Sequence, residues 1–567
     1  MDTDVLIIGA GGAGCRAAIE AANRNVNVTI LCKELFGKAP TVMAEGGYNA
    51  VLNSVGKGDS WQWHFYDTVR GGAWINDQRL VEALVKEAPD RIYDLEDYGA
   101  VLDRTEEGRI NQRRYGKQTH IRTCFVGDRI GHEVMATLIE EIRRLEIQIF
   151  EEFFSTRLLV DGGRVIGVAA LDIKSGDFYA FRAKSTILAS GGGGRLYEVT
   201  TNARGATGDG YAMGYSAGAP LLDMEMVQFH PTGMVYPASH RGILVTEALR
   251  AEGALLFNKG KERFMERYEP KKLELAGRDE VAVAIAREIM EGRGSKEGGV
   301  YLDATRIPPG VMEARLPTML DQFLKLGIDI RKEPVEVAPT VHHFMGGLLV
   351  DEKGETSLKG LYAAGEVAGG IHGANRLGGN GLAATQVFGR RAGAAAAESA
   401  KKTDLPRLDR DQISTIFKHV YGFLDRKEGT RTPSLRRQLQ NLMWSNVGIF
   451  RTEYGLTEAL EWILRSKGKV DSLYVENKAS RYNWEWAETL EIENMLLVAE
   501  MVVRGALERK ESRGAHRRLD FPNPNDAEWW VNILIRDVDG EMQLNKRSAT
   551  TLYIKKPGVG FDEVKWS

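Results

Sequence analysis

A glycine-rich turn near the start of the chain limits what this sequence can fold into more than any other feature. The apolar residues 5–8 predict a buried strand, which leads into Gly9, Gly11 and Gly14 and then a helix over residues 13–23. In a G-x-G-x-x-G turn, the first glycine permits the tight turn, the second lets the backbone approach a pyrophosphate, and the third lets helix and strand pack closely. The N–H groups at the helix N-terminus can bind phosphate, so we expect a dinucleotide here.

The second strand helps to identify the dinucleotide. An NAD site requires an acidic residue about 20 residues after the turn, where it holds the ribose hydroxyls. The second strand is expected over residues 26–31 and is followed by Cys32, Lys33 and Glu34, so that acid is absent or displaced. This argues against NAD as the bound dinucleotide and leaves FAD as the open alternative.

Charge and cysteine spacing exclude several classes of function. The 567 residues include 75 basic and 78 acidic side chains, a net charge of -3, which offers no electrostatic case for nucleic-acid binding. No run approaches the ~18 apolar residues of a membrane span, and the first strand begins too early to follow a signal peptide, so we expect a cytoplasmic protein. Cys15, Cys32 and Cys124 are too far apart for a four-cysteine iron–sulfur cluster, and no spacing suggests metal ligands.

The segment after the second strand resembles a known family. Residues 41–47, Thr-Val-Met-Ala-Glu-Gly-Gly, look like the flavin-edge loop of the flavoprotein subunits of succinate dehydrogenase and fumarate reductase, and the resemblance continues through residues 64–77. Most of that family has a histidine directly before Thr-Val, which bonds covalently to the flavin, whereas this chain has Pro40. Proline offers no nucleophilic nitrogen, so the resemblance implies non-covalent FAD and favours fumarate reduction. The alternative is that hydrogen bonds compensate and the direction is unchanged.

Motifs of the same family follow in order. They are Gln-Phe-His-Pro-Thr-Gly at 228–233, Thr-Glu at 246–247 with Arg-x-Glu-Gly at 250–253, Leu-Ala-Gly-Arg-Asp at 275–279, Pro-Thr-Val-His at 339–342, Met-Gly-Gly at 345–347, Gly-Leu-Tyr-Ala-Ala-Gly-Glu at 360–366 and His-Gly-Ala-Asn-Arg-Leu-Gly-Gly-Asn at 372–380. The resemblance implies that His230, Thr246, His342 and Arg376 hold the two carboxylates of the substrate. An arginine can grip a carboxylate bidentately, and the other three side chains can serve as donors.

The resemblance also implies how the reaction proceeds. A hydride from flavin N5 reaches one alkene carbon of fumarate, and Arg278 delivers a proton to the other. Because the pKa of an arginine lies above about 12, Arg278 can act only as a relay. Glu247 and Arg250 are the expected members that return a proton to it.

A larger set of residues is implied for FAD. A second glycine-rich turn follows the buried strand that begins at 185, and residues 207–210 open the next helix, where Asp209 would reach the dinucleotide. The full set is Gly9, Gly11, Gly12, Gly14, Cys32, Lys33, Thr41, Ala44, Gly46, Gly47, Asp209, Glu366, Gly381 and Leu382.

The resemblance implies an α/β fold with four parts. A Rossmann-like FAD-binding domain at 1–232 and 342–400 is split by an inserted capping domain at 233–341, and a helical domain at 405–520 and a C-terminal segment at 521–567 follow. Periodicity predicts helices at 434–447, 456–466 and 485–509, and residues 550–554 suggest a strand. The basic cluster at 504–518 is interpreted as a solvated face or, alternatively, as a docking surface for an iron–sulfur partner.

The implied partner is an iron–sulfur protein subunit, through which a membrane anchor or a thiol- or quinol-linked complex could join the chain to the inner face of the cytoplasmic membrane.

One departure from the family's motifs supports a different function. The family's reductases commonly carry Gly-Cys where this chain has Ala248 and Leu249, and Thr-Glu-Ala-Leu-Arg looks more like L-aspartate oxidase, a relative with non-covalent FAD. Gly233 and the stretch 113–125 look more like reductases, so a self-contained flavin oxidase is the alternative.

Overall fold

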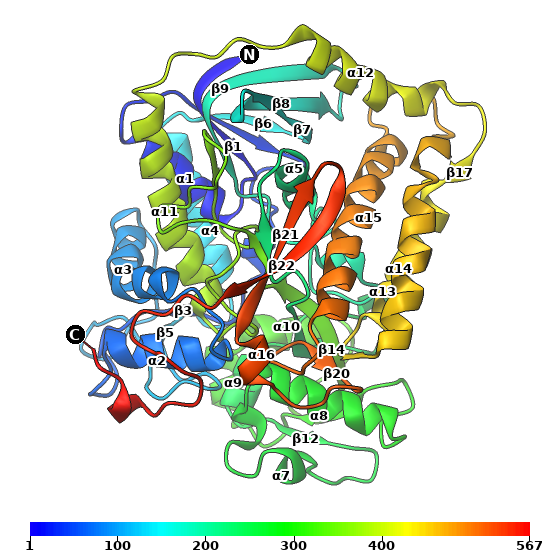
Figure 1. Cartoon of the computed structure of the whole chain (residues 1–567). Coiled ribbons are helices and arrows are strands. Elements are labelled where there is room, and N and C mark those ends of the chain that lie inside the picture. Colours follow the sequence, from blue (N-terminus) through cyan, green and yellow to red (C-terminus); the bar gives the residue numbers. More distant parts are fainter. Residues whose placement is uncertain (567) are drawn as a thin grey trace.

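The computed structural model describes residues 1–566, and a largely parallel sheet lies in the upper part of Figure 1. The strand order is β6-β2-β1-β9-β8-β7, with β16 also paired to β9. These strands are β1 (Asp2–Ile8), β2 (Val28–Cys32), β6 (Gln148–Glu151), β7 (Phe153–Asp161), β8 (Arg164–Asp172), β9 (Phe178–Leu188) and β16 (Leu361–Ala363). Because β1 pairs in parallel with both β2 and β9, its apolar residues 5–8 lie inside the sheet and are buried.

Helices with small residues pack on this sheet. The glycine turn leads from β1 into α1 (Gly12–Ala22), which packs against α11 (Asn380–Ala400) and α4 (Ile130–Arg144), and α11 also contacts α3 (Gln78–Asp97). Figure 1 shows α1 and α11 side by side. A Cβ atom on Gly389 would lie 2.6 Å from the Ala13 carbonyl oxygen, so the small residues of α11 allow its close approach to α1. The helix expected at 13–23 is therefore present as α1.

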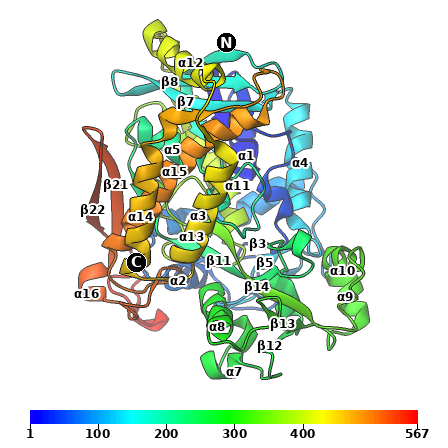
Figure 2. The same cartoon turned by 90° about the vertical axis from the view of Figure 1, so that its right-hand side faces the viewer.

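A second apolar core lies within the expected insertion, between Met234 and Val337. It contains an antiparallel sheet in the order β11-β14-β13-β12, which lies at the bottom of Figure 2 with its helices. The strands are β11 (Val227–Met234), β12 (Leu255–Phe257), β13 (Val300–Asp303) and β14 (Val335–Phe344), and the helices are α6 (Glu247–Ala251), α7 (Met265–Tyr268), α8 (Arg278–Met290), α9 (Pro309–Arg315) and α10 (Pro317–Leu324). The chain enters and leaves this core through the paired strands β11 and β14.

The helical part contains one helix more than the periodicity predicts. The three expected helices are α13 (Thr432–Asn446), α14 (Glu453–Lys467) and α15 (Trp484–Glu508), and α15 packs against the other two. The additional helix is α12 (Arg410–Asp425), whose only fully buried side chains are Val420 and Phe423. Ile413, Ile416, Val420 and Phe423 recur at helical spacing on its inner face, so the signal for α12 was present in the sequence.

The interpretation of the basic cluster as a solvated face is wrong. Arg509, Arg513 and Arg518 are at most 3% exposed. Arg509 forms ion pairs with Glu225 and Glu511 at 2.8 and 3.0 Å between nitrogen and oxygen. The acids that neutralise the cluster come partly from another region of the chain, which local charge counting cannot detect.

The expected strand at 550–554 is also wrong. The C-terminal part contains α16 (Asp526–Trp529) and the hairpin of β21 (Val531–Val538) and β22 (Glu541–Ser548). Strand β21 pairs with β10 (Leu221–Leu222), which pairs in turn with β15 (Gly347–Leu348). The chain then crosses α3, where the Gln78 side-chain oxygen accepts the N–H groups of residues 552, 553 and 554. A side chain thus takes the place of a partner strand.

The remaining elements are short or connect these parts. They are β3 (Tyr48–Asn49), β4 (Gln112–Arg113), β5 (Thr123–Cys124), α2 (Trp61–Gly71), α5 (Asp209–Ser216), β17 (Thr430–Arg431), β18 (Phe450–Arg451), β19 (Leu473–Tyr474) and β20 (Arg517–Arg518). Among residues 1–566, no helix combines the length and apolar character needed to cross a membrane.

Candidate functional site

A cavity of about 590 Å³ extends from the glycine turn to the second core. Most of the expected site residues line it, namely Gly9, Gly11, Gly12, Cys32, Lys33, Thr41, Ala44, Gly46, Gly47, Asp209, His230, Thr246, Glu247, Arg278, His342, Glu366, Arg376, Gly381 and Leu382. Gly14 and Arg250 are the two expected residues outside this lining. Residues from widely separated parts of the sequence therefore meet around one space.

The glycine turn forms one end of the cavity. Residues 9–13 line it and α1 begins there, so the N-terminal end of this helix faces the cavity. Gly9 has φ +111°, a conformation that L side chains rarely adopt. A Cβ on Gly14 would clash with the Gly9 carbonyl oxygen, so Gly14 serves the close packing of helix and strand. The turn can accommodate a pyrophosphate against backbone, as FAD binding requires.

Lys33 and Asp209 lie near this end, but protein partners hold their charged groups. The Lys33 Nζ atom is 2.6 Å from Asp209 Oδ2 and 2.9 Å from Glu491 Oε1. The other Asp209 oxygen accepts a hydrogen bond from Asn494 at 2.9 Å. Direct contact of either charged group with a cofactor stays a prediction, because these groups already satisfy one another.

The flavin-edge loop forms the middle of the cavity. Pro40 begins a short 3₁₀ helix, Pro40–Met43, where the missing N–H of proline costs nothing. The Thr41 hydroxyl oxygen accepts the Gly12 N–H at 3.1 Å and so ties this loop to the start of α1. The Gly46 carbonyl oxygen accepts hydrogen bonds from Arg113 at 2.8 Å and Tyr115 at 2.5 Å. Pro40 itself lines the cavity.

The opposite end gathers side chains from five elements. His230 lies on β11, Thr246 caps α6, Arg278 begins α8, His342 lies on β14, and Arg376 lies in the loop before α11. The rings of His230 and His342 are 5.2 Å apart between centroids. The His342 Nδ1 atom is 2.9 Å from the Thr201 hydroxyl oxygen, which fixes the orientation of the ring. Residues from motifs that are separate in the sequence thus form one polar wall of the cavity.

Arg278 and Glu247 form a buried ion pair in this wall. The Arg278 Nε atom donates to Glu247 Oε2 at 2.9 Å, and Glu247 Oε1 accepts the Gly116 N–H at 3.1 Å. Burial acts to raise the pKa of Glu247, but the guanidiniums of Arg278 and Arg250 outweigh it and lower the pKa. Glu247 is therefore a carboxylate at neutral pH. Arg250 follows it by one turn of α6, and its Nε and Nη2 atoms lack hydrogen-bond partners among the described residues.

In this polar wall, the guanidiniums of Arg278 and Arg376 face one ion-paired carboxylate, Glu247. Burial, with the nearby Arg278 guanidinium, lowers the pKa of Arg376 to about 9. Arg376 has no carboxylate within ion-pair distance in the described chain, and its Nε atom has no hydrogen-bond partner there. Burial lowers the pKa of His230 and His342 well below its usual range, and neighbouring guanidiniums add to this effect. The wall therefore combines arginine cations with neutral imidazoles, an arrangement suited to an anion.

Sequence reasoning missed two histidines of the cavity, His343 and His372. Their rings are 5.3 Å apart between centroids, and His343 Nδ1 is 3.3 Å from Glu366 Oε2. Burial raises the pKa of Glu366 to about 7. His343 directly follows the expected His342, and His372 opens the motif that contains Arg376, so both signals were present in the sequence. Among residues 1–566, no group of three or more His, Cys, Asp or Glu side chains could hold a metal ion.

Comparisons with known proteins identify the family of this chain. A family model described as FAD binding domain matches residues 4–382, and one described as fumarate reductase flavoprotein C-term matches residues 436–558. One of the subunits of the fumarate reductase (CoM/CoB) of Methanothermobacter marburgensis is 52% identical over 545 residues, which cover 94% of this chain and 97% of the relative. The succinate dehydrogenase flavoprotein subunit of Rickettsia bellii is 39% identical over 586 residues, which cover 99% of this chain and 96% of the relative.

Solved structures extend the comparison to three dimensions. The FrdA chain of E. coli quinol fumarate reductase has a TM-score of 0.93 and 35% identity, and the match covers 99% of this chain and 98% of that one. These matches confirm the expected fold class, the expectation of FAD and the expectation of an oxidoreductase. The chain belongs to the family of fumarate reductase and succinate dehydrogenase flavoprotein subunits.

Proposed function

We propose that this chain is the catalytic FAD subunit of an enzyme that interconverts fumarate and succinate, with a bias toward fumarate reduction. The observation that carries the proposal is the charge imbalance at one end of the cavity. Arg278 and Arg376 are at most 8% exposed, and Glu247 is the one carboxylate that pairs with either of them in the described chain. A dicarboxylate would supply the missing negative charge.

The cavity lining suits FAD. The pyrophosphate would lie at Gly11 and Gly12, where the backbone at the start of α1 is accessible from the cavity. The flavin would lie along the loop that contains Thr41, Gly46 and Gly47, with Glu366, Gly381 and Leu382 as further contacts. Bound FAD supplies the hydride of the reaction.

The substrate would be held at both ends. Arg376 would bind one carboxylate through its guanidinium, which remains charged at neutral pH because its pKa is about 9. The neutral rings of His230 and His342 and the hydroxyl of Thr246 would donate to the substrate. His230 Nδ1 lies 3.3 Å from the Thr232 nitrogen and 3.2 Å from the Thr232 carbonyl oxygen. In the tautomer in which Nδ1 accepts the N–H, Nε2 carries the proton and can donate it to a carboxylate oxygen.

Arg278 would deliver the proton. Its Nε atom donates to Glu247, and its two Nη atoms lie toward Gln228 and Gly378. Glu247 would pass a proton back to Arg278 after each turnover, and Arg250, which lies behind Glu247 and outside the cavity lining, would supply Glu247. The buried ion pair keeps the two groups of the first transfer in direct contact.

We propose that FAD is bound without a covalent link, because the ring of Pro40 has no nitrogen that could attack the flavin. Acid precipitation of the purified protein tests this directly. Non-covalent FAD leaves a colourless pellet and a yellow supernatant, whereas yellow colour in the pellet would refute the proposal.

An iron–sulfur subunit would carry electrons to or from the flavin. Cys15, Cys32 and Cys124 are free and buried, and burial raises the pKa of Cys32 to about 12, so none of these thiols is exposed or activated for electron transfer. The names of the relatives support two donors, one linked to CoM/CoB and one to a quinol. We propose that the chain works in the cytoplasm and that any membrane attachment comes through its partners.

The alternative is a flavin oxidase of the L-aspartate oxidase type. The Ala248 and Leu249 departure supports it in the sequence, but both side chains are fully buried in the apolar core and neither lines the cavity. This departure therefore changes packing behind the site and makes no contact with a substrate. Formation of hydrogen peroxide from aspartate would favour the oxidase.

The deciding experiment compares two initial rates of the FAD-loaded chain. One uses a reduced dye with fumarate and the other an oxidised dye with succinate. We expect fast fumarate reduction and slow succinate oxidation. Equal rates would show that Pro40 does not set the direction, and turnover of neither substrate would refute the proposed function.

A further inference from the structure

Residues 115–119, called here the bridging loop, contact the flavin-edge loop, Glu247 and the segment around Arg278. The Tyr115 hydroxyl donates to the Gly46 carbonyl oxygen in the flavin-edge loop at 2.5 Å. The Gly116 N–H donates to Glu247 Oε1 at 3.1 Å. The loop therefore joins the flavin-edge loop to the carboxylate that pairs with Arg278.

The bridging loop also packs against the segment that leads into Arg278. Lys117 Nζ is 2.9 Å from Asp279 Oδ1, one residue beyond Arg278. A Cβ on Gly116 would lie 2.7 Å from the Ala276 carbonyl oxygen and 3.1 Å from Glu247 Oε1. The backbone at Gly116 packs closely against both groups and leaves no room for a side chain. A small displacement of the loop therefore changes its contact with Glu247.

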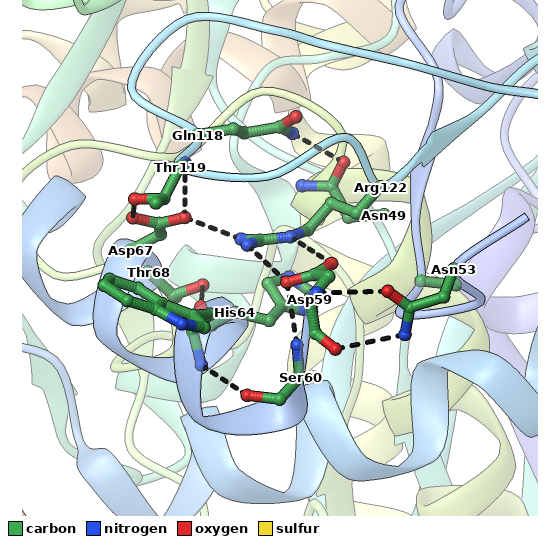
Figure 3. Close-up of polar contacts among 12 residues, drawn as sticks. Asn49, Asn53, Asp59, Ser60, His64, Asp67, Thr68, Gln118, Thr119 and Arg122 are labelled. Atoms are coloured by element: carbon green, nitrogen blue, oxygen red, sulfur yellow. Dashed lines mark hydrogen bonds and ion pairs between the residues drawn. The ribbon is translucent and has the colours of Figure 1, made fainter. Parts of the chain in front are cut away.

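Asp67 on α2 anchors the far end of the bridging loop (Figure 3). It is fully buried and accepts both the N–H and the hydroxyl of Thr119, at 2.7 and 2.6 Å. Arg70 donates to Asp67 at 2.8 Å and to the Lys117 carbonyl oxygen at 3.1 Å, which adds a second link to the loop.

Arg122 joins Asp67 to a second buried carboxylate, Asp59. Its Nη1 atom donates to Asp67 Oδ2 at 2.9 Å, and its Nε and Nη2 atoms donate to Asp59 at 3.1 and 2.8 Å. Figure 3 shows the guanidinium between the two carboxylates. Asp59 makes no hydrogen bond or ion pair with the bridging loop among residues 1–566. The two aspartates share Arg122 but differ in their contact with the loop.

We propose that Asp67 is a positioning residue of the reaction, which acts through Thr119 and the bridging loop to hold Glu247 in line with Arg278. This inference rests on the proposed role of Glu247 and Arg278 in proton delivery. Asp67 touches neither FAD nor substrate positions, since it does not line the cavity. Its effect is transmitted by hydrogen bonds alone.

The arrangement has a consequence for pH dependence. The Gly116 N–H stabilises the Glu247 carboxylate and is one of the contacts that lower the pKa of Glu247. Loss of this hydrogen bond would raise that pKa, because the carboxylate would lose a donor that stabilises its charged form. The substrate-binding side chains His230, His342 and Arg376 make no hydrogen bond to the bridging loop in the described chain, so KM would change little.

The test compares Asp67→Asn with Asp59→Asn in the FAD-loaded chain. Each variant replaces one carboxylate partner of Arg122 by an isosteric amide, but the amide at position 67 offers one acceptor oxygen where four donors are present. We expect Asp67→Asn to lower kcat about tenfold, keep KM within about twofold and move the acidic limb of the kcat profile to higher pH. Asp59→Asn keeps the wild-type kcat profile.

Thr119→Val provides a milder variant that leaves the Asp67–Arg122 ion pair intact. It removes one hydrogen bond to Asp67, and we expect kcat to fall about threefold with the same direction of the pH shift. Hydrogen–deuterium exchange of residues 113–121 gives a readout independent of turnover. Exchange should increase in Asp67→Asn and Thr119→Val and remain at the wild-type level in Asp59→Asn.

Equal losses of kcat in Asp67→Asn and Asp59→Asn, or an unshifted pH profile in Thr119→Val, would overturn the inference. Faster exchange with an unchanged kcat would also overturn it, because the loop would then be anchored without positioning Glu247. A wild-type chain that turns over neither fumarate nor succinate would instead refute the proposed function. In that case, unchanged exchange in Asp67→Asn would overturn the anchoring role independently.

Discussion

Two groups of arginines are buried in this protein, and they differ in how completely carboxylates pair with them. Arg278 and Arg376 face the cavity, where Glu247 pairs with Arg278 and no carboxylate of the described chain pairs with Arg376. Arg509 lies under the C-terminal part, where three carboxylates surround it at 2.8, 3.0 and 3.4 Å. An unpaired buried charge is costly, so the first group indicates where a ligand supplies charge and the second indicates structure.

The two groups also differ in the direction in which the pKa of the arginine is shifted. Burial outweighs all partners at Arg376 and lowers its pKa, whereas the carboxylates around Arg509 outweigh burial and raise its pKa. At Arg376 the lowered pKa coincides with a place in the cavity lining and no partner carboxylate in the described chain, which together indicate room for an anion. Burial alone would not distinguish the two groups, because all three arginines are at most 8% exposed.

The largest expected effect is on catalysis by the first group. Arg278→Gln removes the proposed proton donor while it keeps a side chain of similar length, and we expect kcat for fumarate reduction to fall between about 100-fold and 10,000-fold. The dye assay with fumarate measures kcat per folded molecule, because loss of the buried Arg278–Glu247 ion pair also lowers the thermal midpoint. The exposed Arg315 serves as the control, and Arg315→Gln should keep full activity. Retention of a tenth of the wild-type kcat by Arg278→Gln would rule out its role.

The second expected effect is on stability through the other group. Arg509→Gln leaves Asp223, Glu225 and Glu511 without their shared cation, and we expect a loss of about 3–5 kcal/mol in the free energy of unfolding. Denaturant unfolding measures the loss against Arg315→Gln, and kcat per folded molecule should be unchanged at low temperature. A variant that lost kcat but kept its unfolding midpoint would contradict the division into two groups.

The smallest expected effect is a change in ligand affinity with pH. The pKa of Arg376 is lowered to about 9, so Arg376 is charged below this pH and loses its charge above it. The Kd for succinate should therefore be constant below about pH 8.5 and rise about tenfold per pH unit well above pH 9. A titration of the flavin absorbance with succinate measures the Kd. A constant Kd up to about pH 10.5 would show that Arg376 stays charged or does not bind the carboxylate.

Local sequence patterns predicted the dinucleotide end well, because its chemistry is in the backbone. Gly9, Gly11 and Gly14 lie within one turn and follow a buried strand, so spacing alone specifies strand, turn and helix. The helices with a continuous apolar face were predicted for the same reason. The segment at 550–554 was predicted wrongly, because a side chain that replaces a partner strand leaves no local signal. The helix α12 was missed although its apolar residues recur at helical spacing.

Motifs along the chain were enough to establish the family, the cofactor class and the residue types of the site. Which charges are paired became known only from the folded chain, because ion pairs depend on distances between segments that lie far apart in the sequence. Glu225 neutralises Arg509 across 284 positions, and Asp67 holds Thr119 across 52. The basic cluster at 504–518 therefore proved to be largely buried, and Asp67, to which the sequence assigned no role, proved to anchor the bridging loop.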